Sequence, residues 1–174
     1  TLITTVSYIL FQFGKTYYNK KTGAILALVV CINMMFHTSA VVITPDAPLI
    51  FFLFLTIIYY YKSYFHHEKY FYPAGIFLGL SMLSKVSALF PIIGILSFPI
   101  IIKEKRSYLK NKHFYFSILI ALLIFSPFIY WNLQNDLAFV RYQGAHVMLK
   151  GTLQHFMHLW VGILLIGGPI LFYF

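Results

Sequence analysis

The chain has 174 residues, of which 60% are hydrophobic, 20% are aromatic and only 10% are charged. Soluble domains have about 45–50% apolar and about 25% charged residues. A soluble fold of this length has no interior large enough to bury so much apolar surface. The composition therefore excludes a soluble domain and predicts an all-α, polytopic transmembrane helical bundle.

The formal net charge of +9 raises the question of nucleic-acid binding. The basic residues, however, form short clusters between apolar runs, and the aromatic residues lie inside those runs instead of alternating with Arg and Lys. This arrangement is typical of membrane orientation signals and anionic-lipid contacts. We therefore expect membrane lipid as a partner and no nucleic acid. The single cysteine, Cys31, excludes a disulfide within the chain.

A transmembrane helix needs about 20 apolar residues to cross about 30 Å of hydrocarbon. In chain order, the apolar segments are residues 1–13, 24–43, 47–61, 73–102, 114–131 and 159–174. The polar segments between them are 14–23, 44–48, 62–72, 103–113 and 132–158. With the fourth apolar segment counted once or twice, the sequence predicts about six to seven membrane segments. We read residues 1–174 as one transmembrane domain that is partial, with an N-terminal helix and first outer loop missing and the C-terminus truncated.

The apolar stretch 73–102 is too long for one simple span, and Lys85 interrupts it near its middle. A lysine at the bilayer centre costs about 2.5–3.5 kcal/mol on insertion scales. Two short helices that turn near Ser84–Ser87 avoid this cost, so we predict a hairpin. Within its first arm, Gly75 and Gly79 form a GxxxG pair that permits close helix packing.

The hairpin also explains the distribution of charge. With it, the polar segments 14–23, 62–72 and 103–113 lie on one side of the membrane and contain ten of the 13 Lys and Arg residues. Such a bias places the basic loops in the cytoplasm. A single span over 73–102 would put the most basic loop outside, so we reject it.

This topology brings the rare polar residues of the apolar chain to the non-cytoplasmic side. They are Asp46 in Thr-Pro-Asp-Ala-Pro, Lys85 at the hairpin tip, and residues 131–146 at the start of the outer segment. An acid, a lysine and an arginine at one interface suit an anionic headgroup, a phosphate or a metal-bridged phosphate.

Each candidate also has a structural interpretation. Asp46 could be only the N-cap of the next helix, Lys85 could extend to the interface without a ligand, and Asp136 could pair with Arg141. No Gly-rich phosphate loop, zinc motif or nucleophile elbow is present. These residues alone do not separate an enzyme from a transporter.

Three ordered motifs resemble bacterial members of the GT-C glycosyltransferase superfamily, related to dolichyl-phosphate-mannose protein mannosyltransferases and lipid A aminoarabinose transferases. The first is Thr-Pro-Asp-Ala-Pro-Leu at residues 44–49, and the second is the glycine-rich helix of residues 74–85 that ends in Ser-Lys. The third is Ser-Pro-Phe-Ile-Tyr-Trp-Asn at residues 126–132, followed by Asn-Asp at 135–136 and Phe-Val-Arg-Tyr-Gln at 139–143.

The resemblance implies a transferase that moves a sugar from a polyprenyl-phosphate carrier to an acceptor at the non-cytoplasmic face of the bacterial inner membrane. The substrate-binding residues it suggests are Asp46, Lys85, Asn132, Asp136, Arg141, Gln143 and His146. Lys85 and Arg141 would offset the phosphate charge, while Asp46 would orient a neighbour or help to hold a divalent metal ion. No other cofactor is implied.

The family's acidic pair in the first outer loop, to which the catalytic acid is assigned, has no counterpart here. The catalytic residue is therefore unknown and expected upstream of Thr1, and residues 1–174 alone are expected to be inactive. A transporter or flippase is the alternative function, and a non-catalytic membrane scaffold is a third. A transporter should contain internal repeats, and no segment has a second copy.

Overall fold

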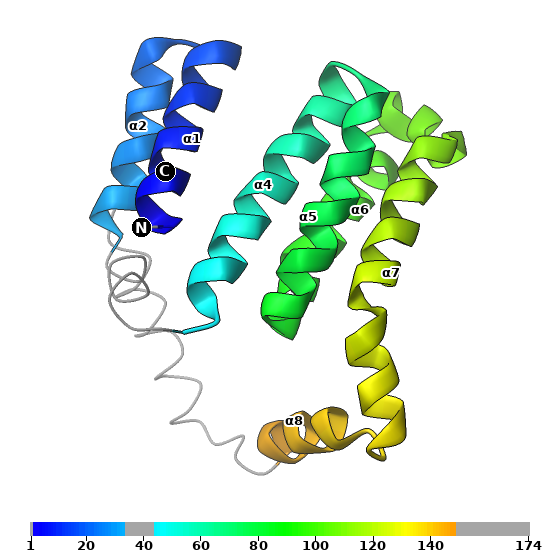
Figure 1. The fold of residues 1–174 in the computed structure, drawn as a ribbon. Helices are drawn as coiled ribbons and strands as arrows, with labels where there is room; N and C mark the ends of the chain where they lie inside the picture. Colours follow the sequence, from blue (N-terminus) through cyan, green and yellow to red (C-terminus); the bar gives the residue numbers. More distant parts are fainter. Residues whose placement is uncertain (1, 34–43, 149–174) are drawn as a thin grey trace.

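The computed structural model describes residues 2–33 and 44–148, and the regular elements in these ranges are helical (Figure 1). The α-helices are α1 (Leu2–Tyr17), α2 (Lys20–Ile32), α4 (Asp46–Phe65), α5 (Phe71–Ser84), α6 (Leu89–Ile101), α7 (Lys112–Gln134) and α8 (Ala138–Met148). The 3₁₀-helices are η1 (Glu68–Tyr70), η2 (Val86–Ala88) and η3 (Lys103–Lys110). The all-α helical bundle predicted from composition is confirmed.

Helices α1 and α2 form a tight antiparallel hairpin (Figure 1). A Cβ atom on Gly14 would lie 2.6 Å from the Cα atom of Gly23, so only glycine permits this approach of the two backbones. Asn19 begins α2, because its side-chain oxygen accepts a hydrogen bond from the Thr22 amide at 2.8 Å. The predicted polar turn over 14–23 is therefore too long, and the helices continue almost to its centre. The second half of the span predicted at 24–43 lies outside the described residues.

The predicted hairpin at 73–102 is present, and its two arms are α5 and α6. Contacts at the two ends of α4 show that α5 and α6 run in opposite directions. Lys85, after α5, reaches Asp46 at the start of α4, whereas Phe98 of α6 lies 5.0 Å from Tyr64 near the end of α4, measured between ring centroids. Helix α6 therefore returns along the bundle in the direction opposite to α5. The break occurs at Lys85, inside the predicted turn.

Helix α7 packs closely against the GxxxG pair of α5. A Cβ atom on Gly75 would collide with the backbone of Ser117 in α7, and one on Gly79 would lie 2.8 Å from the Cβ atom of Ile124. The hydroxyls of Tyr60 in α4 and Ser117 share a buried hydrogen bond of 2.9 Å. The glycines thus permit the close approach of α5 and α7, and the Tyr60–Ser117 hydrogen bond links α7 to α4.

Within the described residues, two helices are long and apolar enough to cross a membrane, namely α4 and α7. A third candidate is the bent pair formed by Val86–Ile101 and η3, whose axes differ by 105°. The remaining long elements, α1, α2 and α5, have 16, 13 and 14 residues. The length criterion therefore gives two to three spans here, fewer than the six to seven predicted for all 174 residues.

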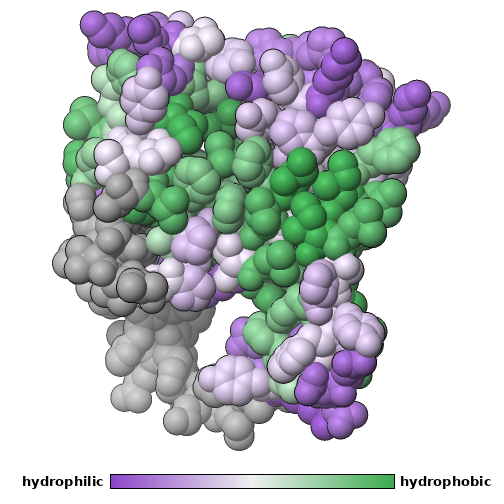
Figure 2. Space-filling model, viewed as in Figure 1, coloured by the Kyte–Doolittle hydropathy of each residue, from purple (hydrophilic) through white to green (hydrophobic). Residues whose placement is uncertain are grey.

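The polar loops gather at one end of the bundle. The α1–α2 turn, the α4–α5 connection and η3 lie together at the upper end in Figure 1, as the positive-inside pattern requires. Figure 2 shows a hydrophilic edge there, with a broad hydrophobic band directly below it. The charge asymmetry predicted from sequence is therefore a real asymmetry of the folded bundle.

Candidate functional site

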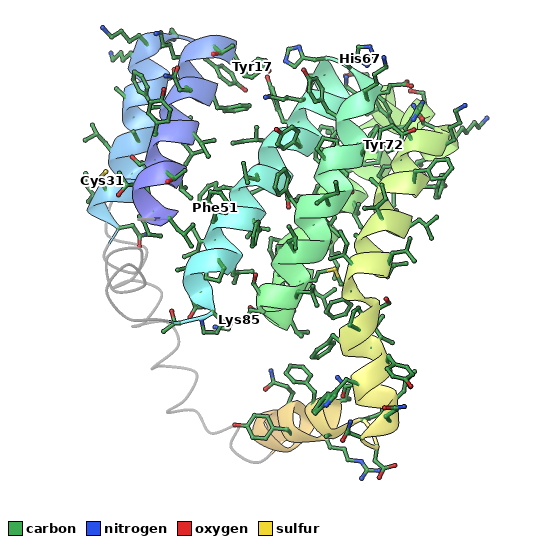
Figure 3. The ribbon with its side chains drawn as sticks, viewed as in Figure 1. Tyr17, Cys31, Phe51, His67, Tyr72 and Lys85 are labelled. Carbon is green, nitrogen blue, oxygen red and sulfur yellow. The ribbon has the colours of Figure 1, made fainter. Side chains whose placement is uncertain are left out.

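Asp46 and Lys85 are placed at the same end of the bundle by two helix termini. Asp46 is the first residue of α4, after Pro45. Lys85 ends α5 in an extended conformation, with φ −161° and ψ 130°, and its carbonyl accepts a hydrogen bond from the Ala88 amide at 3.0 Å. The chain thus leaves the helix at Lys85 and directs this residue across to the start of α4 (Figure 3).

The Nζ atom of Lys85 lies 2.6 Å from Oδ1 of Asp46. The lysine side chain is 45% exposed and the aspartate side chain 23%, so the pair lies at a surface and not in the bundle interior. Pro45, not Asp46, occupies the N-cap position of α4, and no side-chain capping bond is formed. The interpretation of Asp46 as a simple N-cap is therefore wrong. Lys85 is likewise not a lysine without a partner.

The end of α7 and the start of α8 form a sharp corner that Asn132 fixes. Its side chain is buried, and its Oδ1 atom accepts a hydrogen bond from the Phe139 amide of α8 at 3.1 Å. The corner itself needs two left-handed residues, with φ 51° at Asp136 and φ 55° at Leu137. Aspartate adopts this conformation more readily than most residues. Asn132 thus has a structural contact in addition to the binding role predicted for it.

Helix α8 lies across the end of α7, beyond the end of the bundle that carries Asp46 and Lys85 (Figure 1). Asp136, Arg141 and Gln143 are exposed there. His146 belongs to α8, but its side chain lies outside the described part of the chain. The predicted residues therefore share one end of the molecule, in two groups.

Only the first of these groups is joined by a charged contact. Among the residues that the structure describes, the ion pairs are Asp46–Lys85 and Glu68–His113. The pairing considered for Asp136 and Arg141 is therefore not formed. Arg141 remains an exposed cation on α8, apart from the Asp46–Lys85 pair.

A metal site needs several acidic, histidine or cysteine ligands. In residues 2–33 and 44–148, no group of three such side chains lies close enough to hold an ion. Asp46 already contacts an ammonium group, which competes with a cation for its oxygen. The described side chains around Asp46 thus do not by themselves form a metal centre.

Thr44 is a residue near this site that the sequence did not single out. Its hydroxyl oxygen is buried and has no hydrogen-bond partner in the described part of the structure. A buried polar atom without a partner costs about 1–3 kcal/mol. The sequence feature that could have identified it is its position two residues before Asp46, in the same Thr-Pro-Asp-Ala-Pro motif.

The comparisons with known proteins bear on the whole arrangement. A family model described as dolichyl-phosphate-mannose-protein mannosyltransferase matches residues 2–131, which includes Asp46 and Lys85 and ends one residue before Asn132. No curated protein and no solved structure gives a significant match. The match covers more than half of the chain and agrees with the helical membrane bundle. The chain therefore belongs to the dolichyl-phosphate-mannose-protein mannosyltransferase family of GT-C-type membrane glycosyltransferases.

Proposed function

We propose that this protein transfers a sugar from a polyprenyl-phosphate carrier to an acceptor at the end of the bundle where α4 begins. The observation that supports this most is the Asp46–Lys85 pair, a charged contact at the end opposite the basic loops. Family membership favours a transferase over a transporter or flippase. The polar end would face the non-cytoplasmic side of a bacterial inner membrane, with the basic loops in the cytoplasm.

Lys85 has the properties of a phosphate ligand. Its side chain is 45% exposed, so it is open to a molecule arriving at the membrane interface. In the transfer reaction, the bond between the sugar C1 atom and the phosphate oxygen breaks, and a bond from C1 to the acceptor oxygen forms. The phosphate leaves with increased negative charge, which a fixed cation stabilises. The acceptor proton goes to a base that these residues do not supply.

Asp46 would act on Lys85 rather than on the sugar. A lysine side chain has about 2 kcal/mol of rotamer entropy, and the 2.6 Å contact restricts it before the donor arrives. The Thr44 hydroxyl, two residues before Asp46, is buried and has no hydrogen-bond partner among the described residues. A divalent ion at Asp46 would need additional ligands from outside the described side chains.

The exposed residues of α8 would complete the polar end. Arg141 would supply a second positive charge for the donor phosphate, and Asp136, Gln143 and His146 would contact the sugar or acceptor. Asn132 would support these contacts by holding α8 across the end of α7. The acceptor could be lipid A, another glycan or a protein.

The test uses the full-length protein with a radiolabelled polyprenyl-phosphate sugar. Lys85→Met should weaken donor binding by about 10- to 100-fold, because a hydrogen bond to a charged group contributes about 1.5–3 kcal/mol. Asp46→Asn should have a smaller effect, since it leaves the ammonium in place. Lys20→Met, an exposed lysine at the opposite end, is the matched control and should bind donor normally.

The triple variant Asp46→Asn, Lys85→Met, Arg141→Gln provides the decisive result. If this variant keeps its helicity and transfers sugar at the rate of the wild type, the proposal that these charges recognise the donor is contradicted.

A further inference from the structure

The helix η3 lies across the basic end of the bundle. Its axis is turned by 105° from that of the preceding segment Val86–Ile101, so it does not continue in the direction of α6. Immediately before it, Ile100, Ile101 and Ile102 are 57%, 69% and 36% exposed. Such side chains require lipid, whereas Lys103 next to them requires water. The boundary between hydrocarbon and headgroups therefore falls at the start of η3.

One side of η3 is anchored to the bundle. A 3₁₀-helix has three residues per turn, so side chains three apart lie in one row. Lys105 and Tyr108 form such a row, and both donate to the Tyr64 carbonyl, at 2.7 Å from Lys105 Nζ and 3.2 Å from the Tyr108 hydroxyl. This carbonyl lies in the last turn of α4, where helical acceptors lack partners within the helix. Burial, and then the charge of Glu68, raise the pKa of Tyr108, so its hydroxyl remains a donor.

Leu109 packs against the hydrophobic core, whereas the remaining charged side chains of η3 are exposed and mostly positive. Lys103, Arg106 and Lys110 are exposed, as is Lys112 directly after the helix, against the single acid Glu104. The only ion pairs among the described residues are Asp46–Lys85 and Glu68–His113, so these four cations have no acidic partner there. We call these four residues the η3 cationic surface.

We propose that the η3 cationic surface binds the headgroups of anionic phospholipids, with η3 lying in the plane of the membrane interface. The isoleucines that border it fix its depth, and the Lys105 and Tyr108 contacts fix which side faces outward. Unpaired cations at this depth meet lipid phosphates directly. An acidic protein would instead approach from water, and the exposed isoleucines at the border of the surface favour lipid.

The test compares lipid selectivity in bilayers of phosphatidylcholine and phosphatidylglycerol, measured with spin-labelled lipids at the protein surface. The variant Lys103→Gln, Arg106→Gln, Lys110→Gln, Lys112→Gln should reduce the preference for phosphatidylglycerol by about threefold or more. Added salt should reduce the wild-type preference, because all four cations are exposed and salt screens their attraction to the lipid phosphates.

The matched control removes the same number of charges from the same end of the bundle. It replaces Lys15, Lys20, Lys21 and Lys69 by Gln, all of which are exposed. A clearly smaller loss of selectivity in this control supports the proposal. An equal loss in both variants would mean that the effect is one of net charge, and an unchanged preference in the η3 variant would exclude lipid as its partner. Either result overturns the proposal.

Discussion

Asp46 and Lys85 lie 39 residues apart in the sequence and form a contact of 2.6 Å. Ion pairs with this degree of exposure contribute only about 0–1 kcal/mol to stability. The pair therefore does little to hold α4 and α5 together. Its main effect is to fix the position of one ammonium group at the end of the bundle where the polar residues gather.

Lys105 has a different role, because its ammonium is bonded to the backbone. It donates to the Tyr64 carbonyl and lies 4.4 Å from the centroid of the Phe65 ring. A cation at the C-terminus of a helix is also favoured by the helix dipole. Lysine at this position thus stabilises the end of α4 as well as the docking of η3.

Lys105→Met should lower the free energy of unfolding by about 1–2 kcal/mol, since it removes a charged hydrogen bond but keeps the apolar stem. The matched control is Lys103→Met, which removes an exposed lysine from the same helix. Thermal unfolding in detergent, followed by circular dichroism, measures both. Equal stability of the two variants would show that the hydrogen bond from Lys105 to the Tyr64 carbonyl contributes nothing to stability.

At the scale of the elements, glycine decides which helices approach closely. Gly75 lies against the Ser117 backbone, so an added methyl group there meets atoms that cannot rotate away. Gly94 in α6 has nothing within 4 Å of an added Cβ atom. Glycine is therefore required for close packing at position 75 of α5, but not at position 94 of α6.

We predict that Gly75→Ala destabilises the bundle by about 1–3 kcal/mol, the usual cost of overpacking. Gly94→Ala should be neutral or slightly stabilising, because alanine favours a helix more than glycine does. The midpoint of thermal unfolding compares the two. A Gly75→Ala variant as stable as Gly94→Ala would mean that α5 and α7 are not in close contact.

The turn between α5 and α6 was predictable from a single charge. Lys85 interrupts an apolar stretch, and the cost of burying it located the break. The boundaries of α1 and α2 were not predictable in this way. Polar residues such as Lys15 can extend into water from a helix end, so polarity does not mark where the helix stops.

At the scale of the whole molecule, the basic loops gather at one end and the Asp46–Lys85 pair at the other. This arrangement predicts sidedness in the membrane. In a Cys31→Ser background, single cysteines at Lys20 and Glu104 should react with an impermeant thiol reagent from the same side. A cysteine at Asp136 should react only from the opposite side. Labelling of positions 20 and 104 from different sides would contradict the hairpin topology.

The bundle contains two hydrophobic clusters that share α4. One joins α4 to α1 and α2 through residues such as Val6, Val30 and Ile58. The other joins α4 to the hairpin and α7 through Tyr60, Phe71 and their neighbours. No pattern in the sequence indicated that α4 would be central, because its apolar residues surround it on all sides.

The sequence by itself determined the class of protein, the hairpin and the end at which polar residues collect. Composition, charge asymmetry and the cost of a lysine in lipid act along the chain, without reference to partners. Only the tertiary structure decided that Asp46 contacts Lys85 rather than capping α4, that Asn132 holds α8, and that Asp136 and Arg141 stay apart. The first outcome depends on how α4 and α5 are placed relative to each other, and the other two depend on the backbone angles of the corner at Asp136 and Leu137.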